Sequence, residues 1–149
     1  MSSAENLNRF LVAQRPVYSI ALSEIESGKK RSHWMWYIFP QIRGLGFSEV
    51  SKFYAIKNIK EAQEYLTHPV LGERLIEICN VLLKCPTDNA NAIFGRPDDL
   101  KLKSSMTLFS LLPYANPVFL KVLDKYFDGQ KDQETLRIVS GEEKILPLH

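Results

Sequence analysis

Apolar residues near the middle of the chain recur with the spacing of one face of an α-helix: Leu71, Leu75, Ile78 and Leu82. Intervals of three and four residues match the helical repeat and favour a helix with one buried side. The same spacing returns within residues 7–11, 102–109 and 119–126. No segment alternates polar and apolar residues long enough to predict a pair of strands. We therefore predict a mainly α protein, a compact bundle of about seven to eight helices.

Helix boundaries are marked by residues that commonly cap or end helices. Ser48 precedes a segment with helical periodicity, and Asn58 is followed three residues later by Glu61 in the pattern of a capping box. Pro86 ends the helix that contains the leucine stripe, and Gly129 is placed to terminate the helix that follows residue 117. These signals divide the chain into short helices with brief connections.

The length of the chain predicts one domain. Its 149 residues are enough for one hydrophobic core but too few for two stable ones. Hydrophobic residues make up 45% and charged residues 24%, which is typical of a globular protein. We predict a single domain over residues 1–149, with the core in residues 6–139 and a C-terminal tail at 140–149.

Charge and hydropathy exclude several classes of protein. The net charge is +2 and the only basic run is Lys29–Arg31, so nucleic acid is not an expected partner. The longest apolar run, Trp34–Phe39, is far too short to cross a membrane, and the first residues lack the pattern of a secretory signal. We expect a cytoplasmic protein without membrane contact, in which Cys79 and Cys85 are free thiols.

The sequence lacks the motifs of common metal sites, phosphate loops and hydrolase nucleophiles. His33, His68 and His149 are too dispersed to predict a zinc site. A dinucleotide fingerprint is rejected because Glu49 stands where its third glycine would be. We predict no metal and no cofactor, and whether the protein is an enzyme stays open.

The segment SHWMWYIFPQIRGLG, residues 32–46, concentrates aromatic rings between polar side chains. Trp34 and Trp36 suit packing in a core, and they equally suit stacking against a base or a sugar. His33 in front and Gln41 behind are the kind of polar groups that a small-molecule pocket sets into apolar walls. The segment therefore predicts either the wall of a pocket or a piece of the core.

The turn at the end of this segment contains Gly44 and Gly46, ahead of the capping residue Ser48. Glycines before a helix N-terminus let backbone N–H groups approach a phosphate or a carboxylate. The alternative is a tight turn that binds nothing. We retain the three residues as candidate anion-binding positions.

A second polar cluster lies in PDDLKLKSSMTLFS, residues 97–110. In a helix, Lys101, Ser104 and Ser105 share one face, and Thr107 belongs to a second polar strip. Serine and threonine are unfavourable inside helices, so their number here suggests a functional reason. Lysine beside hydroxyl groups is suited to binding a phosphate, or in principle to activating a serine as a nucleophile. The alternative is a helix that merely faces solvent.

The chain resembles a known family in four segments: HWMWYIFPQIRGLG, YLTHPVLGERL, IFGRPDDLKLKSSMTLF and VLDKYFDGQKDQETL. They are similar, in order and spacing, to the bacterial family called domain of unknown function 1810, whose members are often labelled calpastatin. The resemblance implies a compact, mostly helical single domain and supplies no established activity. Calpastatin inhibits through disordered repeats, whereas this chain has the apolar faces and caps of a globule. The family also looks distantly like the all-α NADAR proteins linked to ADP-ribose metabolism.

These observations lead to one hypothesis and one alternative. The protein would bind, and in one version hydrolyse, a nucleotide-like or ADP-ribose-like ligand, a small phosphorylated molecule, in a polar-aromatic pocket. The tryptophans would stack, the glycine turn and the Lys101 helix would receive phosphate, and His33 would be the acid or base. The alternative is a protein-interaction module without catalysis that uses the aromatic block as its anchor. We expect a monomer or a weak homodimer.

Overall fold

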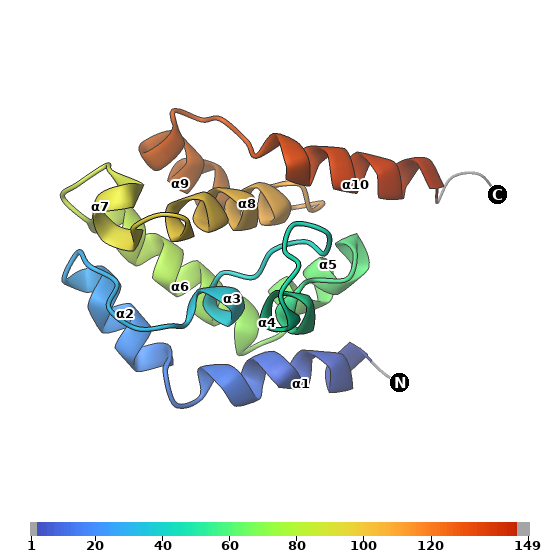
Figure 1. Ribbon diagram of the computed structural model, residues 1–149, viewed down its shortest axis with the longest axis horizontal. Coiled ribbons are helices and arrows are strands. Elements are labelled where there is room, and N and C mark those ends of the chain that lie inside the picture. The colour runs from blue at the N-terminus through green and yellow to red at the C-terminus, as the bar shows by residue number, and fades with distance from the viewer. Residues whose placement is uncertain (1–2, 146–149) are drawn as a thin grey trace.

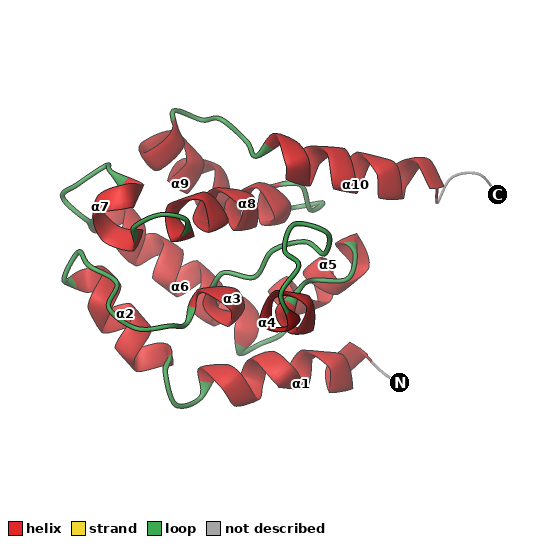
Figure 2. Ribbon diagram, in the orientation of Figure 1, coloured by secondary structure: helices red, strands yellow, loops and turns green. Residues whose placement is uncertain are grey.

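The computed structural model describes residues 3–145, and the side chains of residues 7–141. This range contains the helices α1 (Ser3–Gln14), α2 (Tyr18–Glu26), α3 (Met35–Ile38), α4 (Glu49–Tyr54), α5 (Ile59–Thr67), α6 (Leu71–Lys84), α7 (Ala90–Phe94), α8 (Asp98–Ser110), α9 (Val118–Phe127) and α10 (Gln133–Ile145) (Figure 1). Loops connect them, and within the described range no strand is present (Figure 2). One isolated parallel bridge pairs Ile42 with Ile56.

The mainly helical architecture confirms the prediction, but the described residues form ten helices, more than the expected seven to eight. The additional elements are α3 and α7, of four and five residues. Both are too short for an apolar period to show in the sequence. The start of α7 is set by Asn89, whose side chain accepts a hydrogen bond of 3.2 Å from Ala92 N.

The centre of the bundle is α6, whose leucine stripe is buried against α2, α5 and α9. The helix α8 also has many neighbours, because it packs against α7, α9 and α10. In Figure 1, α1 and α2 form the lower part of the molecule, and α8, α9 and α10 form the upper part. The loop after α3 runs between these two parts. This course brings the aromatic segment of the sequence next to α8.

The junction between α5 and α6 is unusually close. His68 Nδ1 accepts hydrogen bonds from Val70 N at 3.1 Å and Leu71 N at 3.2 Å, which satisfies donors at the start of α6. Gly72 is buried in the same turn, where an added Cβ would lie 1.9 Å from the carbonyl oxygen of Leu66. Only glycine allows the backbone of α6 to approach the end of α5 in this way.

Two further predictions concern membranes and thiols. No helix within residues 3–145 is long and apolar enough to cross a lipid bilayer. Cys79 and Cys85 are free and buried, as expected. Burial raises the pKa of the Cys79 thiol far above its ordinary value, so this group stays protonated at neutral pH and is a poor nucleophile.

Candidate functional site

The two polar clusters of the sequence meet in the structure at Trp36 and Lys101. The Nζ atom of Lys101 lies 4.0 Å from the centroid of the Trp36 ring, in cation–π contact. Around this contact the surface forms a hollow of about 240 Å³. One wall consists of Trp36, Gln41, Leu45 and Gly46. The opposite wall consists of Pro97, Leu100, Lys101 and Ser104 at the start of α8, with Asp132 and Glu134 at the start of α10.

A smaller hollow adjoins the first and shares the four residues of its first wall. The rest of its lining comes from residues 42–44 and from Ser51, Lys52, Tyr54 and Ala55, in and just after α4. Its volume of about 20 Å³ has room for one or two water-sized groups. We treat the larger and the smaller hollow together as the candidate site.

Gln41 lies where the two hollows meet. Its backbone is held by the bridge to residue 56, because Ile56 N donates to Gln41 O and Arg43 N donates to Ile56 O, both at 2.8 Å. Gln41 as a whole is only 8% exposed. Its Nε2 atom has no hydrogen-bond partner among the described residues. An unsatisfied donor of this kind is rare in folded proteins and requires an explanation.

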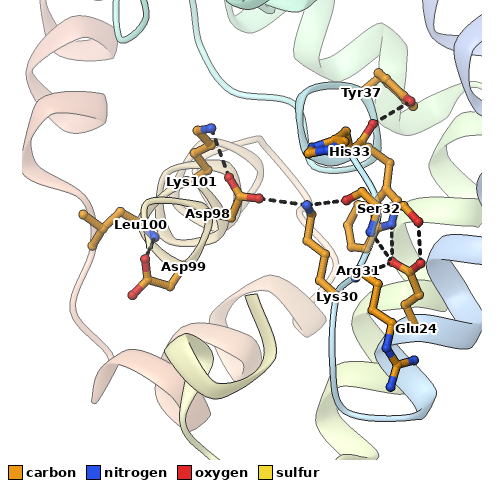
Figure 3. A network of polar contacts seen from close by, with 11 residues as sticks. Glu24, Lys30, Arg31, Ser32, His33, Tyr37, Asp98, Asp99, Leu100 and Lys101 are labelled. Atoms are coloured by element: carbon orange, nitrogen blue, oxygen red, sulfur yellow. Dashed lines mark hydrogen bonds and ion pairs between the residues drawn. The ribbon is translucent and has the colours of Figure 1, made fainter. Parts of the chain in front are cut away.

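The position of Lys101 is fixed by a chain of ion pairs (Figure 3). Asp98 lies between two lysines, with Lys101 Nζ 3.0 Å from its Oδ1 and Lys30 Nζ 2.9 Å from its Oδ2. Lys30 also donates a hydrogen bond of 2.5 Å to the carbonyl oxygen of Ser32. Burial by itself raises the pKa of Asp98, but the two lysines outweigh burial and lower it. The chain holds the Lys101 ammonium group over Trp36.

The loop before α3 is anchored on Glu24 of α2 (Figure 3). The Glu24 carboxylate accepts hydrogen bonds from Arg31 N (2.9 Å), Ser32 N (3.1 Å), Ser32 Oγ (2.6 Å) and Trp34 Nε1 (2.8 Å). Burial by itself raises the pKa of Glu24, but these hydrogen bonds outweigh burial and lower the pKa to about 2. Trp34 is 1% exposed, so it belongs to the core and to this anchor and does not line either hollow.

Only part of the predicted polar face of α8 borders the site. Lys101 and Ser104 line the larger hollow, and Ser104 Oγ donates a hydrogen bond of 3.2 Å to Leu100 O. Ser105, which the sequence grouped with them, is fully buried and lines neither hollow. Its Oγ atom has no hydrogen-bond partner among the described residues. The hydroxyl of Ser105 is thus not part of the site.

The α10 wall is fastened by Thr107, which is also buried and lines neither hollow. Thr107 Oγ1 accepts a hydrogen bond of 2.9 Å from Asp132 N. The Asp132 carboxylate caps α10, because its Oδ2 accepts hydrogen bonds from Thr135 N at 3.0 Å and Thr135 Oγ1 at 2.6 Å. Glu134 lies 2.7 Å from Arg137 in an exposed ion pair. The role of Thr107 is therefore to position this wall.

The structure separates the remaining predicted residues. Gly44 and Gly46 both line the smaller hollow, and Gly44 has a φ of +108°, which favours glycine. Ser48 caps α4 as predicted, but it lines neither hollow. His33 is exposed and lines neither hollow; its carbonyl oxygen accepts a hydrogen bond of 3.1 Å from Tyr37. The proposed acid or base is therefore outside the site.

Several residues that line the site were not predicted from the sequence: Arg43, Leu45, Lys52, Tyr54, Leu100, Asp132 and Glu134. Arg43 and Leu45 could have been found, because they lie inside the segment between the aromatic block and the glycines. The others come from α4, α8 and α10. Periodicity and caps do not encode which helices meet across the fold.

The helical bundle places the protein among small all-α proteins, and its two adjoining hollows form one candidate binding site. The chain belongs to the family described as a protein of unknown function (DUF1810), whose model matches residues 4–139. It is similar to the crystal structure of the conserved hypothetical protein Rv1873 from Mycobacterium tuberculosis, with 45% identity and a TM-score of 0.88. That match covers 91% of this chain and 96% of the other. No curated protein matches the sequence.

Proposed function

We propose that the protein binds a small nucleotide-like ligand in the larger hollow. One observation carries the proposal: Gln41 lines the site, and its buried Nε2 atom has no hydrogen-bond partner among the described residues. Leaving such a donor unsatisfied costs about 1–3 kcal/mol, so its retention favours a bound molecule that accepts the bond.

The walls of the hollow supply groups that recognise a nucleoside. Trp36 lines the hollow and is partly buried, with the Lys101 ammonium group over one face of its ring. A base would stack on the part of the ring that borders the hollow, a contact that contributes about 1–3 kcal/mol per base in proteins that bind single strands. Gln41 and Ser104 offer an amide and a hydroxyl to the polar edge of a base. Asp132 uses its Oδ2 atom to cap α10, which leaves Oδ1 to accept a bond from a sugar hydroxyl.

We propose binding without assigning a reaction. His33, the acid or base suggested by the sequence, lies outside both linings, and neither lining contains a histidine or a cysteine. The alternative of an aromatic anchor for a protein partner has less support, because Trp34 and Phe39 are buried and Trp36 is partly buried. The aromatic block does not form an exposed patch.

The first test is a thermal-shift screen with nucleosides, their mono- and diphosphates, ADP-ribose and NAD. A ligand present at 100 times its Kd should stabilise the fold by about 2.7 kcal/mol. We expect Trp36→Ala and Lys101→Ala each to abolish the shift. The matched control is Lys103→Ala on the same helix, because Lys103 lines neither hollow and lies 6.0 Å from the Phe127 ring. A flat response to every compound would contradict the proposal.

A second prediction separates binding from stability at Gln41. Glutamine and methionine are similar in size, so Gln41→Met removes the unsatisfied amide without leaving a cavity. We expect the free energy of unfolding without ligand to rise by about 1 kcal/mol and ligand binding to be lost. Chemical denaturation and a binding titration measure the two effects.

The control for Gln41 is a second buried glutamine. Gln14 Nε2 donates hydrogen bonds to Tyr37 O at 2.8 Å and to the Tyr65 hydroxyl at 2.9 Å. Gln14→Met leaves these partners without a donor, so it is expected to destabilise the protein by about 1–3 kcal/mol. If Gln41→Met destabilises the protein as much as Gln14→Met does, the Gln41 amide already has a partner in the free protein and is not kept for a ligand.

A further inference from the structure

We propose that the smaller hollow is an oxyanion subsite that receives a phosphoryl or carboxylate group of the ligand held in the larger hollow. This inference rests on the proposed function and deepens it, because it names the charged group that the ligand carries.

The charges around the smaller hollow point to an anion. Eleven residues line it, and none of them is acidic. Two are cationic, Arg43 and Lys52, and both are exposed. Neither makes an ion pair with another described residue. Two positive side chains without carboxylate partners favour an anionic ligand and attract it from solution.

The larger hollow differs in this respect. Its cation, Lys101, is already paired with Asp98, and its α10 wall carries the carboxylates of Asp132 and Glu134. A phosphoryl group placed there would meet two negative charges. The sequence assigned phosphate to the Lys101 helix, but the structure places the unpaired positive charges on the side of Arg43 and Lys52.

Hydrogen-bond donors accompany these charges. The buried Nε2 atom of Gln41, a residue that is 8% exposed, lacks an acceptor among the described residues. The side chains of Arg43 and Lys52 add charged donor groups to the same lining. An oxyanion is an acceptor only, so it complements a site that offers several donors.

The size of the smaller hollow limits what can enter. Its volume of about 20 Å³ has room for one or two oxygen atoms but for no ring. A carboxylate group carries two oxygen atoms, and a phosphoryl group carries three, of which it would turn one or two into this space. The shared wall of Trp36, Gln41, Leu45 and Gly46 lets one ligand place its ring in the larger hollow and its charged group in the smaller one.

The test compares nucleosides with their 5′-monophosphates by calorimetric titration, with inorganic phosphate and acetate as separate probes. For the wild type, we expect each monophosphate that binds to do so at least about tenfold more tightly than its nucleoside, because charge-assisted hydrogen bonds are added. Arg43→Gln combined with Lys52→Gln should remove this advantage and leave nucleoside affinity unchanged. The matched control is Arg15→Gln combined with Lys60→Gln, two exposed residues that line neither hollow.

The outcomes separate the two proposals. If nucleosides and monophosphates bind equally and the Arg43 and Lys52 substitutions change nothing, the oxyanion subsite is wrong and the proposed function stands. If nucleosides and monophosphates fail to bind but inorganic phosphate or acetate binds and is lost in the double variant, the subsite stands and the proposed function is wrong. Whether phosphate or acetate binds more tightly then tells a phosphoryl ligand from a carboxylate ligand. Binding of no probe overturns both.

Discussion

Glu24→Gln is expected to lower the free energy of unfolding at neutral pH by about 3 kcal/mol. The folded protein lowers the pKa of this carboxyl group from 4.5 to about 2. A change of one in pKa corresponds to about 1.4 kcal/mol of free energy. Glutamine keeps one acceptor oxygen, but its amide NH₂ group would face Ser32 and Trp34, whose groups donate hydrogen bonds to the carboxylate in the wild type. Chemical denaturation at pH 7 measures the difference.

Glu26→Gln is the control for this variant, since Glu26 lies on the same helix and is exposed. It should change the stability by no more than about 0.5 kcal/mol. Equal stabilities of the Glu24 and Glu26 variants would show that the loop before α3 does not depend on its carboxylate anchor.

The stabilisation by Glu24 has a defined pH dependence. Because the folded protein lowers this pKa, the contribution is complete above about pH 4.5 and is lost as the pH falls towards 2. In that window the unfolded chain takes up the proton first, so acid favours unfolding. Glu24→Gln has no proton to take up at this position. The difference in the free energy of unfolding between wild type and variant should therefore become smaller as the pH falls from 4.5 towards 2.

Gly72→Ala is the second substitution with a large expected effect. An added Cβ would lie 1.9 Å from Leu66 O and 2.8 Å from Leu66 C, both backbone atoms that no side-chain rotation can move. Alanine favours helices over glycine by about 1 kcal/mol, but the clash forces α5 away from α6 in the centre of the bundle. We expect a net loss of about 3 kcal/mol or more in the free energy of unfolding.

Gly141→Ala tests this explanation with the opposite sign. Gly141 lies in α10, and a Cβ there meets no atom of the described residues within 4 Å. Alanine should stabilise this position by about 0.5–1 kcal/mol through helix propensity alone. Thermal and chemical unfolding should show a lower stability than wild type for Gly72→Ala and a higher stability for Gly141→Ala. Similar behaviour would mean that the clash at Gly72 is relieved at little cost.

The helices and their buried faces could be predicted from the sequence, because both depend on local spacing. The caps at Ser48 and Asn58 are confirmed, with hydrogen bonds from Ser51 N at 3.1 Å and Glu61 N at 2.9 Å. The short helices α3 and α7 could not be predicted, since a single turn carries too few residues to define a face.

The candidate site could be predicted only in part. The sequence singled out Trp36, Gln41 and Lys101, and the structure brings them together in one hollow. It also suggested Ser105 and Thr107, whose side chains are buried outside that hollow. Spacing identifies the polar positions of a helix, but it does not tell which of them the rest of the fold covers. That depends on contacts between distant segments, such as the bond between Thr107 and Asp132.

The short helix α3 and the residue before it give the two tryptophans different surroundings. Trp34 is sealed in the core with its indole N–H bonded to Glu24, whereas Trp36 borders the hollow beneath Lys101. Successive side chains on a helix point in different directions, so two residues along the chain are enough to separate them. The protein thus carries two built-in fluorophores. The emission of Trp34 would report the folding of the bundle, and that of Trp36 would report a molecule that binds in the candidate site.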